Sequence, residues 1–146
     1  MSESLEQKIN QIVEREVPRL RLMQPTDVTV SQSPGVWSRK EILGHLIDSA
    51  SNNHQRFVRA QFSDELTFPG YAQNDWVRVQ GYADEEWQQI VEVWRALNKH
   101  LAHMVGRIPK EKLEIQCSIG GNAPVTLEGL IQDYIKHMEH HLAQLT

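Results

Sequence analysis

The stretch Ser38-Arg-Lys-Glu-Ile-Leu-Gly-His-Leu-Ile-Asp-Ser-Ala-Ser-Asn-Asn-His-Gln-Arg-Phe-Val-Arg-Ala-Gln-Phe62 carries the clearest helix signal of this 146-residue chain. Ser38 followed by Glu41 is a capping box, in which each side chain accepts a hydrogen bond from a backbone N–H at the helix start. The pattern predicts a helix to about Phe62 with one buried face. Apolar residues recur along that face at helical spacing, namely Leu43, Leu46, Ile47, Ala50 and Phe57.

Three further segments show the apolar periodicity of amphipathic helices. They cover about residues 4–17, 84–106 and 126 to the C-terminus. Residues 113–119 alternate weakly between apolar and polar side chains, which indicates a short extended piece. Four helices with little strand predict an all-α fold, a four-helix bundle in a single domain of residues 1–146.

The connections between these helices differ in length. Pro18 is expected to kink or end the first helix, and residues 24–34 are expected to form a loop because Pro, Ser and Thr recur there. The segment 63–83 is a long loop between the second and third helices and contains Tyr71 and Trp76. A connection of about 20 residues is unusual inside a compact domain, and such segments often carry function.

The composition excludes several classes of protein. A net charge of −4 with scattered basic residues gives no basic surface for nucleic acid. No uncharged run is long enough to cross a bilayer, and the N-terminal residues lack a signal-peptide pattern. Cys117 is the only cysteine, which excludes an internal disulfide and a Cys-x-x-Cys motif. We therefore expect a cytoplasmic protein without nucleic-acid or membrane partners, whose metal ligands, if present, are nitrogen and oxygen.

Two histidines near the C-terminus, His137 and His141, are spaced one helical turn apart. On a helical wheel, His141 lies roughly 55° and His137 roughly 95° from the centre of the apolar arc, on the same side. His140 points toward solvent. A pair at this spacing can chelate one ion, although such pairs also arise by chance. The segment lacks the Glu of the zinc-protease helix motif, and the same lack disfavours a carboxylate-bridged di-iron site.

The second helix carries His45 roughly 140° from the centre of its apolar face. Ser49, Asn52 and Arg56 share the same stripe. This stripe is either a solvated helix face or a polar strip that lines a groove between two helices. His54 lies on the opposite side, within the apolar arc, so it is expected to be a core histidine and cannot share an ion with His45.

The third helix contains a competing pair, His100 and His103, which point away from its apolar stripe and are expected on the surface. Asn98 lies within that stripe. A buried amide needs hydrogen-bond partners, so Asn98 is expected either to satisfy a backbone group or to face a polar cavity.

Several motifs together match one known family in order and spacing. They are Trp37–Ser49, the aromatic residues Tyr71 and Trp76, and Thr126–Leu142. In this combination the chain resembles the DinB/YfiT-like family from about residue 5 to residue 145. The resemblance implies a four-helix bundle with up-down-down-up connectivity and, often, a homodimer.

The resemblance also implies a divalent ion, nickel or zinc, held by one histidine of the second helix and two of the fourth. The matching positions are His45, His137 and His141. Helical geometry favours the last two residues, whereas His45 enters through the resemblance. Three protein ligands would leave coordination positions open for water or substrate.

The family includes bacillithiol- and mycothiol-dependent transferases and isomerases, and members labelled as metal-dependent hydrolases. We therefore expect a metal-dependent enzyme of small-molecule chemistry, either a hydrolase or a thiol S-transferase with a low-molecular-weight thiol as cofactor. The alternative is a non-catalytic module of a stress response that binds a metal or a small ligand. Nothing near Cys117 marks it as an activated nucleophile.

Two sets of residues would complete such a site. Asp48 and Asp133, each one turn from a ligand histidine, either orient that histidine or are surface carboxylates. A guanidinium such as that of Arg56 suits a carboxylate-bearing substrate, whereas the aromatic residues of the long loop could also simply pack on the bundle. Candidates for substrate contact are Asn52, Arg56, Tyr71 and Trp76.

Overall fold

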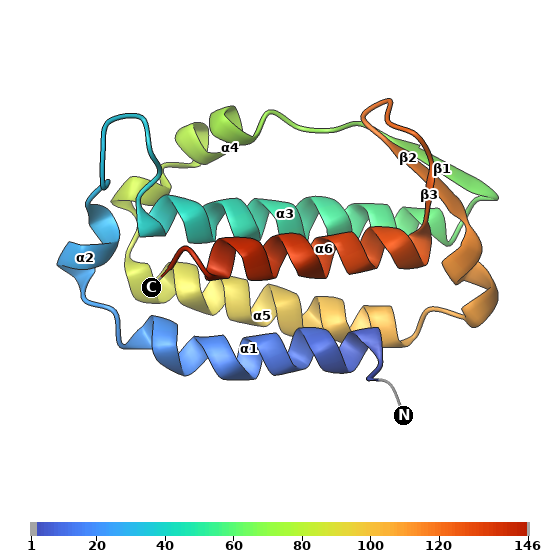
Figure 1. The fold of residues 1–146 in the computed structure, drawn as a ribbon, viewed down its shortest axis with the longest axis horizontal. Helices are drawn as coiled ribbons and strands as arrows, with labels where there is room; N and C mark the ends of the chain where they lie inside the picture. Colours follow the sequence, from blue (N-terminus) through green and yellow to red (C-terminus); the bar gives the residue numbers. More distant parts are fainter. Residues whose placement is uncertain (1–2, 146) are drawn as a thin grey trace.

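Four long helices form the body of the molecule in this computed structural model, which describes residues 3–145 (Figure 1). α1 packs chiefly against α5, and α3 packs against both α5 and α6. The four helices expected from the sequence are all present, and within residues 3–145 none is long and apolar enough to span a membrane. Their bounds are Leu5–Arg21 for α1, Arg39–Ala60 for α3, Trp87–Gly106 for α5 and Leu127–Leu142 for α6.

The ends of these helices follow the expected capping chemistry. The Ser38 hydroxyl accepts from the Glu41 N–H at 3.3 Å, and the Glu41 carboxylate accepts from the Ser38 N–H at 3.0 Å. At the start of α6, Thr126 Oγ1 accepts from the Gly129 N–H at 3.0 Å. Pro18 does not end α1, which continues to Arg21 because Leu20 extends the buried apolar face.

A small sheet at one end of the bundle corrects the expectation of an all-α fold (Figure 1). β1 pairs in parallel with β2, with Leu66 opposite Cys117, and β2 pairs antiparallel with β3. These strands are too short to show a clear period-2 pattern, and β1 and β2 are far apart in the sequence. Only β2 coincides with the extended piece expected within 113–119. The strands are β1 (Glu65–Phe68), β2 (Gln116–Ile119) and β3 (Val125–Thr126).

The two segments expected to be loops also contain helical turns. Residues 24–34 include α2, and the long connection 63–83 includes β1 and α4, with the single-turn helix η1 at its end. These helices are too short to show helical periodicity in the sequence. Their bounds are Pro25–Thr29 for α2, Gln73–Gln80 for α4 and Tyr82–Asp84 for η1, and a further turn, η2, covers Lys110–Glu114.

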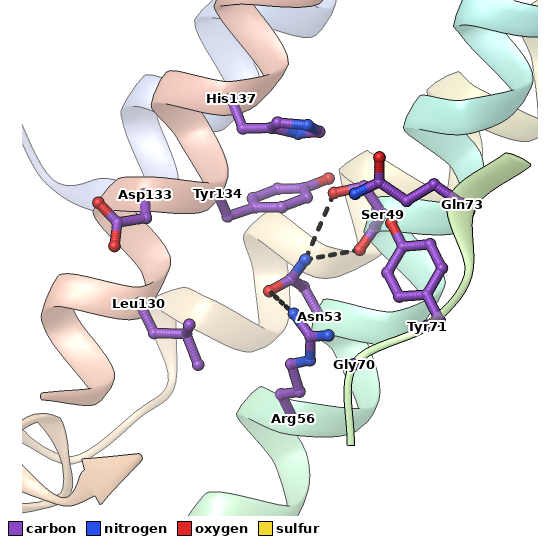
Figure 2. A pocket seen from close by; sticks show the side chains of 10 residues that line it. All are labelled: Ser49, Asn53, Arg56, Gly70, Tyr71, Gln73, Leu130, Asp133, Tyr134 and His137. Atoms are coloured by element: carbon purple, nitrogen blue, oxygen red, sulfur yellow. Dashed lines mark hydrogen bonds between the residues drawn. The ribbon is translucent and has the colours of Figure 1, made fainter. Parts of the chain in front are cut away.

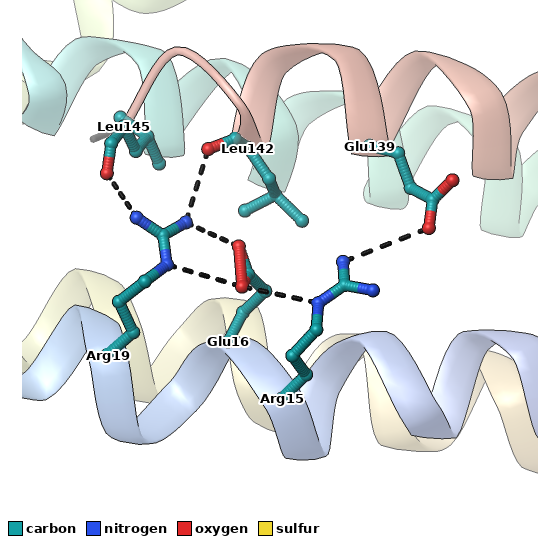
Figure 3. Close-up of polar contacts among 6 residues, drawn as sticks. All are labelled: Arg15, Glu16, Arg19, Glu139, Leu142 and Leu145. Atoms are coloured by element: carbon teal, nitrogen blue, oxygen red, sulfur yellow. Dashed lines mark hydrogen bonds and ion pairs between the residues drawn. The ribbon is translucent and has the colours of Figure 1, made fainter.

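The C-terminal end of α6 is held by Arg19 of α1 (Figure 3). The Arg19 guanidinium donates to the carbonyl oxygens of Leu142, at 3.2 Å, and of Leu145. Buried Glu16 accepts from Arg19 Nε at 3.2 Å and so fixes the guanidinium. The last carbonyls of a helix have no partner within the helix, so Arg19 secures the turn that follows His141.

The long connection runs back along α3 (Figure 1). Buried Tyr82 anchors it there. The Tyr82 ring covers Gly44, where an added Cβ would lie only 2.3 Å from Tyr82 Cδ2. Gly44 therefore lets the connection approach α3 directly beside His45.

The substitution Gly44→Ala is expected to lower the free energy of unfolding by about 1–3 kcal/mol, because the methyl group overpacks this contact. Urea denaturation would show a lower midpoint with an unchanged m value. In a Tyr82→Leu background the same substitution should be neutral or stabilising, since Ala favours a helix over Gly by about 1 kcal/mol. An undiminished cost in that background would contradict the contact.

Candidate metal centre

Three histidines from two helices converge in the interior of the bundle. His45 lies on α3, and His137 and His141 lie one turn apart on α6. The Nε2 atoms of His45 and His137 are 3.3 Å apart, and one nitrogen from each of the three rings lies within 4.8 Å of the others. The two α6 histidines are half-buried at the border of the apolar face, as the helical wheel predicts.

His45 is completely buried, with 0% of its surface exposed. The polar stripe that it shares with Ser49 and Arg56 is also buried, against α6 and the long connection. The interpretation of this stripe as a solvated helix face is therefore wrong. The structure shows the alternative, a polar strip that lines a groove between two helices. The wheel places His45 far from the apolar centre of α3, but neighbouring elements cover α3 on that side too.

The spacing of the His45 and His137 rings fits two ligands of a single small cation. Two nitrogens bound at about 2.0–2.1 Å to one tetrahedral ion lie about 3.3 Å apart, which matches the His45–His137 distance of 3.3 Å. Neutral imidazoles are good ligands for zinc, nickel, copper and iron. The donor set of His45, His137 and His141 therefore fits a divalent transition metal.

Burial keeps two of the rings in the form that can bind a cation. Burial, with smaller contributions from His141 and His137, lowers the pKa of His45 from 6.5 to about 4. Burial, with smaller contributions from His141 and His140, lowers the pKa of His137 to about 4. Both imidazoles are neutral at neutral pH, and neutral imidazole is the metal-binding species.

The remaining histidines lie outside this cluster. His100, His103 and His140 are exposed, as expected. His54 is only partly buried and contacts His100, with ring centroids 5.4 Å apart, so its assignment to the core is wrong. His54 of α3 thus lies beside the exposed His100 of α5 and stays partly open to solvent.

Asn98 is fully buried and forms a hydrogen bond to a backbone group, which was one of the two expectations for this residue. Its amide donates to the Trp94 carbonyl at 2.9 Å, and its carbonyl accepts from the Tyr134 hydroxyl. Tyr134 packs edge-on against Phe57 and also lines a cavity between α3, α6 and the long connection. Asn98 thus fixes one wall of that cavity.

A cavity of about 280 Å³ adjoins His137 between α3, α6 and the long connection (Figure 2). Arg56 and Tyr71, both expected to contact substrate, line it. Asn52 and Trp76 do not: Asn52 donates to the Asp48 carbonyl at 2.9 Å, and Trp76 contacts the Tyr71 ring at 5.1 Å. The lining residues are Ser49, Asn53, Arg56, Gly70, Tyr71, Gln73, Leu130, Asp133, Tyr134 and His137.

Several lining residues were not singled out from the sequence. Ser49 was noted only as part of the stripe of His45, and Asn53 follows it by one turn and donates to the Ser49 carbonyl at 2.8 Å. The signal that could have found Asn53 is this i, i+4 spacing on the buried polar stripe. Gln73 and Tyr134 could not be found in this way, because they come from other elements.

The two acidic candidates occupy different surroundings. Asp48 is buried and accepts from Tyr82 at 2.8 Å and from Gln80 at 2.7 Å, so it ties α3 to the long connection. Burial raises the pKa of Asp48, against the effect of these two hydrogen bonds. His45 Nδ1 has no hydrogen-bond partner among the described residues. Asp133 is exposed at the cavity rim, with its carboxylate turned away from the other side chains in Figure 2.

Comparison with known proteins identifies the protein family. The family model of the DinB superfamily matches residues 13–145, so the chain belongs to this superfamily. This confirms the resemblance found in the sequence.

Individual relatives are distant. The chain is 22% identical over 111 residues to a protein of Oceanobacillus iheyensis named "Putative metal-dependent hydrolase"; the match covers 76% of this chain and 64%, less than two thirds, of that relative. The solved structure of YfiT from Bacillus subtilis, described as "a probable metal-dependent hydrolase with an unusual four-helix bundle topology", gives a TM-score of 0.79 at 19% identity. That match covers 98% of this chain and 85% of YfiT, and at this identity it supports the fold.

The metal-free protein should lose stability as the pH falls from 6.5 to about 4. In this window the unfolded state binds protons at His45 and His137 that the folded state does not, so the free energy of unfolding rises with pH. Urea denaturation in the presence of a chelator measures the slope. A His137→Asn variant should show a smaller slope and a His103→Asn control an unchanged one; equal slopes in wild type and His137→Asn would contradict the buried neutral ring.

Proposed function

We propose that the chain is a divalent-metal-dependent hydrolase of small molecules whose ion is held by His45, His137 and His141. The observation that carries this proposal is the convergence of three imidazole nitrogens within 4.8 Å beside a cavity. The names of the two relatives, both described as metal-dependent hydrolases, support the same reaction class. Zinc and nickel both suit the donor set.

Three protein ligands leave room for water or substrate on the ion, in contrast to a closed four-ligand structural site. A bound divalent cation lowers the pKa of water and polarises a carbonyl oxygen. The protein's own residues supply the rest. His45 and His137 stay neutral and in place, and the cavity beside His137 holds the substrate against α3 and α6.

A thiol S-transferase reaction at the same metal site is the alternative that the family resemblance suggests. Cys117 is buried and burial raises its thiol pKa, so a transferred thiolate would have to come from a low-molecular-weight thiol. The other alternative is a non-catalytic module of a stress response that binds a metal or a small ligand. The homodimer and the cytoplasmic location stay predictions.

Metal content is the first test. Protein purified without a histidine tag should contain about one divalent ion per chain, as expected for one three-ligand site. The double variant His137→Ala/His141→Ala should lose the ion while a His140→Ala control, altered at the exposed neighbour on the same helix, retains it. Elemental analysis measures both. Full metal retention in the double variant would contradict the site.

Activity is the second test. The metal-loaded protein should hydrolyse members of a panel of small amides and esters, and the activity should disappear on chelation and return when zinc or nickel is added back. Conjugation of thiols to electrophiles, measured in parallel, should be absent. Conjugation without hydrolysis would contradict the hydrolase and favour the transferase, whereas inactivity in both assays with full metal content would favour the binding module.

A further inference from the structure

A buried arginine without an acidic partner lines the cavity beside the metal centre. Arg56 is 8% exposed, and its buried Nε donor has no hydrogen-bond partner within residues 3–145. Among the described residues, its guanidinium donates only to the side-chain amide oxygen of Asn53, at 3.5 Å. It lies over the rings of Phe68, at 5.8 Å, and Tyr71, at 6.0 Å. In the described part of the chain it makes no ion pair.

Such an arrangement is costly for the folded protein alone. Burial lowers the pKa of Arg56, but a guanidinium stays protonated at physiological pH. Aromatic faces attract a cation, yet they do not accept its N–H groups as an oxygen does. A buried charge is normally paired. Arg56 therefore presents unsatisfied donors and a net positive charge to whatever enters the cavity.

We infer that Arg56 binds the carboxylate of the substrate, so that the substrates are small amides or esters that carry a carboxylate. The planar fork of a guanidinium matches a carboxylate in two parallel hydrogen bonds. Figure 2 shows Arg56 at one end of the cavity and His137 at the other, with Asn53 and Ser49 between them on α3. A molecule held at Arg56 thus extends toward the metal ligands. The reaction in this inference rests on the proposed function, but carboxylate binding does not.

The cavity favours a singly charged carboxylate over a phosphate. Among the described residues that line it, Arg56 is the only Arg or Lys, and Asp133 places a negative charge at the rim. A dianionic phosphate held at Arg56 would call for a second positive charge at that end of the cavity, which the described lining residues do not supply. The volume of about 280 Å³ lies just below the range of sites that hold drug-sized ligands, which favours a small metabolite over a peptide as the substrate.

Arg59 offers a matched control. It lies on the same helix and over the same Phe68 ring, at 6.0 Å, but it is exposed, bonds to Gln55 and does not line the cavity. Loss of Arg59 changes the local charge by the same amount as loss of Arg56 and leaves the carboxylate subsite intact.

The test compares N-acetylglycine with its neutral amide, N-acetylglycinamide, as probes of the full-length protein with and without metal. Calorimetric or NMR titration should show that the wild-type protein, even after chelation, binds the carboxylate at least roughly tenfold more tightly than the amide. The preference should disappear in Arg56→Met, be reduced in Arg56→Lys and persist in Arg59→Met. In the wild-type protein the carboxylate alone should shift the Nε–H resonance of Arg56, a readout that needs no variant to fold.

The outcomes separate this inference from the proposed function. A preference that survives in Arg56→Met, or that exists only in the metal-loaded protein, would place the carboxylate on the metal and overturn the subsite. Equal binding of the two probes to the wild-type protein would overturn it as well. Carboxylate discrimination at Arg56 in a protein that takes up neither zinc nor nickel would leave the subsite standing and remove the metal-dependent hydrolase.

Discussion

The α3 helix buries polar side chains along with apolar ones, and the rest of the site depends on this constraint. His45 and Arg56 lie on a buried stripe that faces α6 and the long connection. A buried polar group without a partner costs about 1–3 kcal/mol. In the part of the chain that the structure describes, His45 Nδ1 and Arg56 Nε are both such groups. Buried polar groups that lack a partner are typical of a binding site, where folded proteins tolerate local strain. A bound ligand would supply the partner that Arg56 Nε lacks, whereas an ion would bind His45 at Nε2, the nitrogen that faces His137.

Other contacts hold this stripe in register with α6. Arg19 caps the C-terminal turn of α6 beyond His141, and Asn98 fixes Tyr134 one turn before Met138 on the same helix. On the opposite side, Asp48 draws Tyr82 and the long connection onto α3. Because these contacts lie on either side of the histidines, the imidazoles reach ligand spacing through the fold and not through a local motif.

Much of this arrangement could be predicted from the sequence. Capping at Ser38 and Thr126 and the apolar periodicity indicated all four long helices, because these signals are local. The same periodicity separated His137 and His141 from His140. The wheel failed for His45, since it measures distance from the apolar centre and ignores what covers the polar side. The sheet could not be predicted, because Leu66 and Cys117 pair across 51 residues in strands of four residues.

The central claim is that His45 completes a three-imidazole metal site. X-ray absorption at the edge of the metal found in the purified protein tests it most directly. The account predicts three imidazole nitrogens at about 2.0–2.1 Å with at least one further oxygen ligand, and the loss of one imidazole or of the metal in His45→Ala. A sulfur ligand, or a spectrum that is unchanged in His45→Ala, would contradict it.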